Sequence, residues 1–140
     1  MRPIVLFAVC CLLLLGCAAE QPSPSVRIKA PQNDAVVQTS TVIVELSAEN
    51  VDIVPADGTQ TPGQAHHHVF VDVDLSPAGL PIPAGVEGIF HMGTGDSTLI
   101  IQDITPGRHR LIAVLARGDH VPLDPWVVDT IFVTVEAGPN

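Results

Sequence analysis

The sequence predicts an all-β fold, an antiparallel β-sandwich of the immunoglobulin or fibronectin type. Several short segments alternate apolar and polar residues with the two-residue period of a strand. Clusters of Pro, Gly, Asn and Asp separate these segments. No window of about 11 residues beyond the first apolar run shows a helical period. About six strands without helices are typical of two sheets packed around one core.

Residues 1–16 have the pattern of a secretory signal peptide. One positive charge at Arg2 precedes an apolar run over residues 4–15, which is short for a membrane span. The sequence Leu-Leu-Gly-Cys that ends at Cys17 resembles the bacterial lipobox, in which the signal is cut before a cysteine that then carries lipids. The alternative is an ordinary secreted protein. We expect a lipoprotein of the bacterial cell envelope, facing the periplasm or the cell surface, with the membrane as its partner.

Residues 17–25 are predicted to hold the lipidated cysteine and a flexible tether, and residues 26–137 a single β-sandwich domain. The mature chain would have 124 residues, from position 17 to position 140, which is enough for one hydrophobic core. Cys10 and Cys11 leave with the signal and Cys17 is modified, so no free thiol remains. A disulfide framework and a cysteine-ligated metal site are therefore excluded.

The mature chain is strongly acidic. Six basic residues less Arg2 leave five against fifteen acidic ones, a formal charge of −10 with neutral histidines. Such a surface repels nucleic acid and attracts cations. Nucleic-acid binding is thus the least favoured function, although solubility alone would explain the acidity.

The strand pattern also assigns faces. Within 41–47, the alternate residues Val42, Val44 and Leu46 face the core, and residues 111–115 are apolar on both faces, as in a central strand. In the segment 66–75, His67 shares a face with the valines, whereas His66 and His68 share the opposite face. The predicted strands, in order, cover residues 26–29, 41–47, 66–75, 97–104, 108–117 and 129–136.

Four separated segments resemble one bacterial exported family, the domain of unknown function 4399 family. They are PGQAHHHVFVDVD, HMGTGDSTLII, TPGRHRLIAVLARGDH and VPLDPWVVDTIFVTV, and together they span roughly residues 26–135. The resemblance implies an immunoglobulin-like sandwich and makes all six histidines family features, but it implies no catalytic residue. One departure is Leu123, near which relatives often carry a further histidine.

His66 and His68 form a candidate pincer for a divalent metal. Their β-carbons lie about 6.5–7 Å apart along a strand, a spacing that lets two imidazoles converge on one ion. The alternative is that they face solvent or pair with nearby carboxylates. His67, on the apolar face, is better interpreted as a core-edge histidine with a backbone or carboxylate partner.

His91 and His120 are candidate ligands from loops, with satisfied turn histidines as the alternative. The triplet begins one strand and His120 follows the end of another, so antiparallel neighbours would bring them to the same rim. His109, which follows a Pro-Gly turn, would then lie at the opposite rim. There it would replace the corner tyrosine of related sandwiches and act as a structural residue.

The ligand set favours zinc(II) or copper(II), since imidazole suits both and no thiolate is available. His67, Asp72 and Asp119 are candidate partners that orient the ligating rings, and Asp72, Asp74 or Asp119 could instead supply a carboxylate ligand. The leading hypothesis is a non-enzymatic, lipid-anchored envelope protein that binds a divalent metal. The alternatives are an accessory module whose histidines form a hydrogen-bond network, and a metal-dependent enzyme, which no catalytic motif supports.

Overall fold

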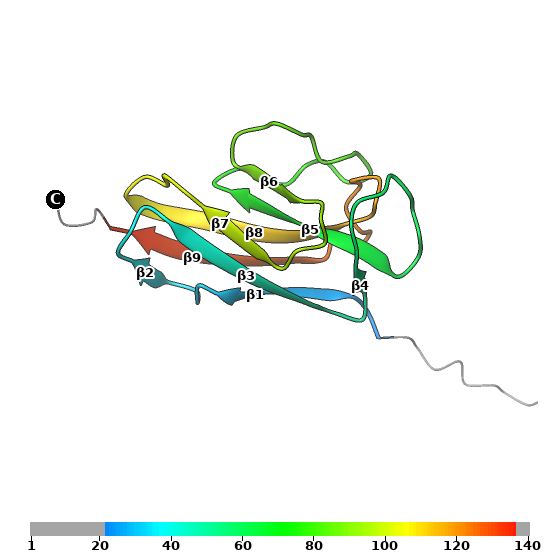
Figure 1. Cartoon of the computed structure of the whole chain (residues 1–140), viewed down its shortest axis with the longest axis horizontal. Coiled ribbons are helices and arrows are strands. Elements are labelled where there is room, and N and C mark those ends of the chain that lie inside the picture. The colour runs from blue at the N-terminus through cyan, green and yellow to red at the C-terminus, as the bar shows by residue number, and fades with distance from the viewer. Residues whose placement is uncertain (1–21, 137–140) are drawn as a thin grey trace, which may run out of the picture.

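The computed structural model describes residues 22–136, which form two facing β-sheets and contain no helix (Figure 1). No membrane-spanning helix is therefore present in this range. The predicted signal peptide and Cys17 lie outside the described residues. The strands are β1 (Ser25–Ala30), β2 (Ala35–Val37), β3 (Val42–Glu49), β4 (Asp52–Ile53), β5 (Gln64–Val71), β6 (Ile89–Met92), β7 (Thr98–Ile101), β8 (Gly107–Ala116) and β9 (Val128–Val135).

The smaller sheet has the order β1-β3-β7 and is antiparallel. Its central strand alternates as the sequence predicts: Val42, Val44 and Leu46 are buried, whereas Ile43 and Glu45 are exposed. The buried face of the smaller sheet packs on the larger sheet, and its other face is exposed, so the residues of β3 alternate between buried and exposed. The predicted inward face of residues 41–47 is thus confirmed.

The larger sheet has the order β2-β9-β8-β5-β4, and β6 also pairs with β5. Its central pairs β9-β8 and β8-β5 are antiparallel, but β2 runs parallel to β9 and β4 runs parallel to β5. The all-β class is therefore confirmed, whereas purely antiparallel pairing is wrong: this sheet is mixed and curls into a half-barrel. The two parallel strands have three and two residues, too few to show a period or a direction in the sequence.

Three short strands were not predicted, namely β2, β4 and β6. The prediction of a loop at His91 is wrong, because His91 lies within β6 and pairs in register with His68. The predicted strand over residues 66–75 is instead Gln64–Val71, and it ends where Asp72 takes a left-handed φ of 58°. A residue in that conformation interrupts the extended backbone.

The larger sheet is buried on both faces at its centre, which explains the continuous burial along β5 and β8. Its inner face joins the main core between the sheets. Its outer face carries a second, smaller core in which Phe70, Ile112 and Val114 meet Ile82. Ile82 belongs to residues 72–88, here called the cover segment, which arches over the outer face between β5 and β6 (Figure 1). Full burial of one such side chain contributes about 1.5–3 kcal/mol.

Candidate metal centre

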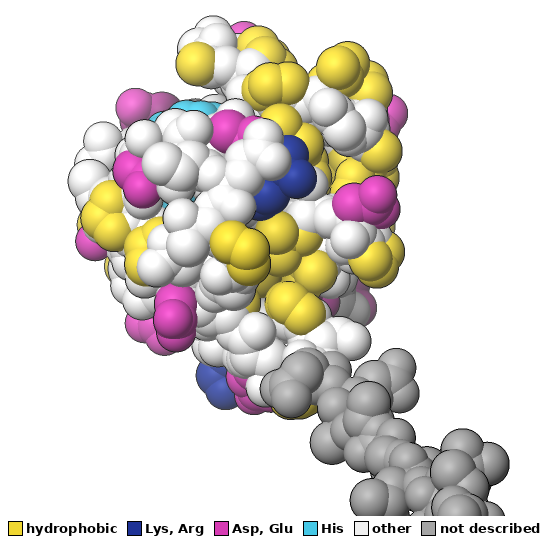
Figure 2. Space-filling model, turned by 90° about the vertical axis from the view of Figure 1, so that its right-hand side faces the viewer, with side chains coloured by type: hydrophobic (Ala, Val, Ile, Leu, Met, Phe, Trp, Pro, Cys, Tyr) yellow, Lys and Arg dark blue, Asp and Glu magenta, His cyan; other side chains and the backbone are white. Residues whose placement is uncertain are grey.

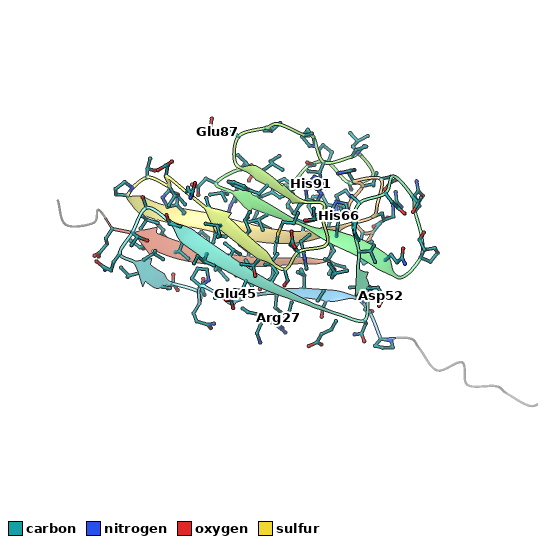
Figure 3. The ribbon with its side chains drawn as sticks, viewed as in Figure 1. Arg27, Glu45, Asp52, His66, Glu87 and His91 are labelled. Carbon is teal, nitrogen blue, oxygen red and sulfur yellow. The ribbon has the colours of Figure 1, made fainter. Side chains whose placement is uncertain are left out.

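Four histidines meet at one rim of the larger sheet, and the strand pairing places them there. In the β5-β8 pair His66 faces Ala116, so the turn that follows β8 brings His120 to the start of β5. In the β5-β6 pair His68 faces His91. Figure 3 shows His66 and His91 next to each other beneath the cover segment. These four residues, here called the histidine cluster, each offer one ligand atom, and these atoms all lie within 4.8 Å of one another.

The cluster is close to tetrahedral. The Nε2 atoms of His66 and His68 are 2.9 Å apart, and those of His91 and His120 are 3.1 Å apart. The six distances between ring centroids run from 4.6 to 5.8 Å. Four imidazoles that bind one ion tetrahedrally at 2.0–2.1 Å would place their centroids about 5.2 Å apart. The residues present thus fit a four-coordinate metal ion with small movements of the rings.

Half of the cluster is buried and half reaches the surface. The exposed fractions of His66 and His68 are 0% and 1%, whereas His120 is half-buried and His91 is exposed. Only a small area of histidine appears on the face drawn in Figure 2, beside acidic side chains. Two ligands are therefore held rigidly in a central strand, and two come from a short edge strand and a turn.

Burial favours the uncharged form of three rings of the cluster, His66, His68 and His91. Burial, with repulsion from neighbouring imidazoles, lowers the pKa of His66 to about 4 and that of His68 to about 3. Burial and the nearby His120 also lower the pKa of His91. A metal ion binds the neutral imidazole, so at neutral pH it would not need to displace protons from these rings.

The buried rings lack further hydrogen-bond partners. The Nδ1 atoms of His66 and His68 are buried and have no partner among the described residues. Ligating histidines usually donate this second N–H to a carboxylate or carbonyl, and loss of such a partner typically lowers metal affinity 10- to 100-fold. The missing acceptors predict moderate rather than tight binding.

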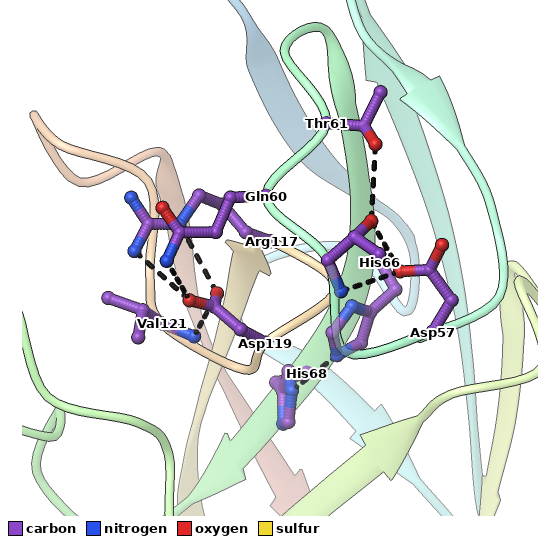
Figure 4. A network of polar contacts seen from close by, with 9 residues as sticks. Asp57, Gln60, Thr61, His66, His68, Arg117, Asp119 and Val121 are labelled. Atoms are coloured by element: carbon purple, nitrogen blue, oxygen red, sulfur yellow. Dashed lines mark hydrogen bonds and ion pairs between the residues drawn. The ribbon is translucent and has the colours of Figure 1, made fainter.

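Asp119, a predicted orienting partner, lies near the cluster but is occupied elsewhere. Its carboxylate accepts hydrogen bonds from Gln60 at 2.7 Å, from Arg117 at 3.2 and 3.4 Å, and from the backbone of Val121 at 3.3 Å (Figure 4). Its negative charge still acts on His66, whose pKa it partly raises. Asp119 thus holds the turn that carries His120 and contributes charge rather than a direct hydrogen bond.

Gly93 is a site residue that was not predicted from the sequence. A methyl group added at this position would overlap the Cε1 and Nε2 atoms of His91, so the ring lies directly against the glycine backbone. The Gly93 backbone does not adopt a left-handed φ, so glycine is required at this position only because the His91 ring leaves no room for a side chain. The glycine two residues after His91 was the available signal, within the motif His-x-Gly.

A cavity of about 210 Å³ adjoins the cluster. Its walls combine three histidines of the cluster with apolar and small residues: His68, His91, His120, Ile82, Pro83, Ala84, Gly85 and Ile89. Because residues 82–85 belong to the cover segment, this cavity lies between the segment and the sheet. An ion in this cavity would lie beside the buried ring of His68 and the rings of His91 and His120.

The other predicted residues lie away from the cluster. His67 points into the main core, where its Nδ1 lies 3.1 Å from the carbonyl oxygen of Asp96 and its Nε2 has no partner among the described residues. Asp72 lies at the opposite end of β5, where it contacts His109 and Arg110. Asp74 pairs with Arg110 at 2.7 Å. The structure brings none of these three to the cluster, so Asp72 cannot orient a ligating ring.

His109 occupies that opposite end together with Asp72, and the two are here called the corner pair. Its Nδ1 lies 2.6 Å from the Asp72 carboxylate and its Nε2 lies 2.7 Å from the carbonyl oxygen of Thr105. Neutral imidazole has only one N–H, so both bonds form only with the protonated ring. Burial acts to lower the pKa of His109, but the bonds to Asp72 and Thr105 outweigh it and raise that pKa.

The two facing sheets and the histidine cluster at one rim of the larger sheet define the class of the chain, a two-sheet β-protein with a four-histidine cluster. The chain belongs to the DUF4399 family, described as a domain of unknown function, which matches residues 44–136. No curated protein matches it. The X-ray structure of the endo-beta-1,4-mannanase from Thermotoga petrophila is similar in fold, with a TM-score of 0.50 and 15% identity. That match covers 84% of this chain and 21% of the mannanase chain, so the chain spans about a fifth of that protein.

Proposed function

We propose that this protein binds a divalent transition metal, zinc or copper, through His66, His68, His91 and His120. One observation carries the proposal: four imidazole ligand atoms from three separate parts of the chain lie within 4.8 Å of one another. Gathering four histidines on one rim costs conformational entropy, and burying two of them without further partners costs desolvation energy. Coordinate bonds from the four Nε2 atoms to a bound ion would offset these costs, although the Nδ1 atoms of His66 and His68 keep no partner among the described residues.

The test is calorimetric titration of the tag-free protein, with its thiols blocked, against zinc and copper. We expect binding well below millimolar in the parent and its loss in the double variant His66→Ala/His68→Ala. The control is His109→Gln, which removes a single histidine at the opposite rim, and it should bind like the parent. Parent affinity weaker than about millimolar, or unchanged binding in the double variant, would overturn the proposal.

A second candidate function is supported by the hydrogen bonds themselves. The pairs His66-His68 and His91-His120 can each share a proton without any metal, at 2.9 and 3.1 Å. In that case the protein is an accessory module whose histidines fix the loops for a protein partner. The same titration separates the two, because this candidate requires no metal affinity and predicts a loss of stability in the double variant.

We also propose that the protein is exported to the bacterial cell envelope and held on a membrane by lipids on Cys17. The sequence Leu-Leu-Gly-Cys after a short apolar run supports this proposal. The sandwich itself would be of the immunoglobulin type, which the facing sheets and the absence of helices in residues 22–136 support. Cys17→Ser should release the protein from the membrane fraction, and retention of this variant would refute anchoring by this cysteine.

A further inference from the structure

We infer that the ion is zinc in a closed structural site, and that it fastens the cover segment onto the outer face of the larger sheet. This inference rests on the proposed metal binding and adds the identity and the role of the ion. Three observations support it: the tetrahedral arrangement of the rings, the three parts of the chain that supply them, and the single hydrogen bond that joins residues 75–85 of the cover segment to the rest of the described chain.

The arrangement favours zinc over copper(II). The centroid distances of 4.6 to 5.8 Å scatter around the value of about 5.2 Å for a tetrahedron. Copper(II) prefers square-planar or tetragonal coordination, whereas zinc accepts the tetrahedron without loss. All four positions would be filled by imidazoles, and closed four-ligand sites are typical of structural zinc, because catalytic zinc keeps one position open.

The ligands come from three separate elements of the larger sheet and its rim. His66 and His68 belong to the central strand β5, His91 to the edge strand β6, and His120 to the turn after β8. One ion would therefore cross-link a rigid strand to two surface elements. His120 holds a left-handed φ of 67°, so its ring position depends on a tight turn rather than on a sheet ladder.

The cover segment depends on that turn. Among the described residues, one hydrogen bond joins residues 75–85 to the rest of the protein, and it runs from the backbone N–H of Ile82 to the carbonyl oxygen of His120 at 2.9 Å. The segment then enters β6, which carries His91 two residues past Ile89. An ion that fixes His91 and His120 thus fixes both the end of the segment and the one hydrogen bond that joins its middle to the rest of the described chain.

The cover segment shields an apolar patch on the outer face of the larger sheet. Phe70, Ile112 and Val114 are buried there against Ile82 and its neighbours. If the segment opens, these side chains meet water. Zinc lowers the equilibrium constant for any opening that breaks the metal site by the factor 1 + [Zn]/Kd. This factor is about 100 when the free zinc concentration is 100 times its Kd. Zinc would therefore set how often the outer face is exposed.

The test is amide hydrogen exchange of the tag-free protein, with its thiols blocked, in saturating zinc and in chelator. We expect zinc to slow exchange at Ile82 and along the cover segment by at least about tenfold through local opening, whereas the core strand β3 should respond only through the change in global stability. In His120→Asn the effect of zinc should disappear. Asn tolerates the left-handed backbone, and the carbonyl that binds Ile82 remains, so the metal-free exchange should match the parent. His109→Gln, at the opposite rim, should keep the effect of zinc.

Cobalt(II) provides the geometric readout, since its tetrahedral complexes absorb visible light far more strongly than its octahedral ones. Strong absorption that zinc displaces would support the closed tetrahedral site. Zinc binding without slower exchange in the cover segment would overturn the fastening role and leave metal binding intact. Weak, octahedral-type absorption, or a preference for copper(II) beyond its general advantage, would overturn the assignment to zinc. Absence of any metal binding would instead overturn the proposed function.

Discussion

The two ends of the β5-β8 pair both bury histidine, but they supply its nitrogens with different partners. At the corner pair, each ring nitrogen of His109 faces an oxygen acceptor, at 2.6 and 2.7 Å. At the histidine cluster, the rings face one another, and the Nδ1 atoms of His66 and His68 have no partner among the described residues. The acceptors therefore decide the state of each ring: two oxygen acceptors favour the protonated ring of His109, whereas their absence leaves His66 and His68 as neutral ligands for a metal ion.

The contrast extends to charge. Burial lowers the pKa of His68 to about 3 and that of His66 to about 4, while the Asp72 and Thr105 oxygens raise the pKa of His109 against the effect of its burial. The cluster and the corner pair thus make opposite contributions to the pH dependence of stability.

The largest expected effect is acid destabilisation of the metal-free protein through the cluster. The unfolded chain binds protons at His66 and His68 with an ordinary pKa near 6.5, and the folded protein does so only near 4 and 3. Stability is thus fully present above pH 6.5 and falls as the pH drops towards 4, by up to about 1.4 kcal/mol per pH unit for each ring. Urea unfolding at pH 7, 6 and 5 in chelator measures this loss.

The control for this effect is His68→Leu, which removes one buried ring and keeps every acidic residue. Its unfolding free energy should fall less steeply with acid than that of the parent, by up to about the slope of one proton. Parallel slopes in the two proteins would show that the acid loss comes from carboxylates, and the proposed contrast would then lose its main support.

The next effect in size is stabilisation by zinc. At a free zinc concentration of 100 Kd, the unfolding free energy should rise by about 2.7 kcal/mol, since the ion binds the folded chain. Thermal unfolding at constant pH measures the rise. Asp72→Asn should leave the increment unchanged, because energies of distant sites with no shared partner add. An increment that shrinks in this variant would show that the two ends are coupled.

A smaller effect is expected at the corner pair. Asn tolerates the left-handed φ of 58° at position 72 and still accepts the Arg110 N–H, but it removes the charge beside His109. Asp72→Asn should cost about 1–3 kcal/mol at pH 6. The raised pKa of His109 means that this stabilisation is complete below pH 6.5 and is lost as the pH rises through the folded-state value, so the cost should shrink at pH 9.

The matched control is Asp74→Asn, two residues along, where an exposed carboxylate pairs with Arg110. Exposed pairs contribute little, so this variant should stay within about 1 kcal/mol of the parent at both pH values. A cost for Asp72→Asn that is equal at pH 6 and pH 9 would contradict a protonated His109.

The sequence predicted the separation of the two ends but not how the cluster is enclosed. Strand direction alone placed His120 at the rim of His66 and His68 and put His109 at the other, because antiparallel strands bring a start to an end. The burial of His66 and His68 was not predictable, since residues 82–85, which lie over His68, belong to an irregular segment and such segments have no period. The position of His91 in a strand was not predicted either, because the four residues of β6 are too few to show an alternating pattern.

The smallest expected effect tests the packing that positions one ligand. Gly93→Ala adds a methyl group that overlaps the His91 ring, and because the Gly93 backbone is not left-handed, the overlap is the main cost. The ring must turn away, so metal affinity should fall roughly tenfold while the metal-free stability changes little. Gly95→Ala, two residues along at a left-handed φ of 82°, should do the reverse and lower stability with little effect on affinity. Equal affinity in Gly93→Ala and the parent would mean that His91 contributes nothing to binding, and the cluster would then be a three-histidine site.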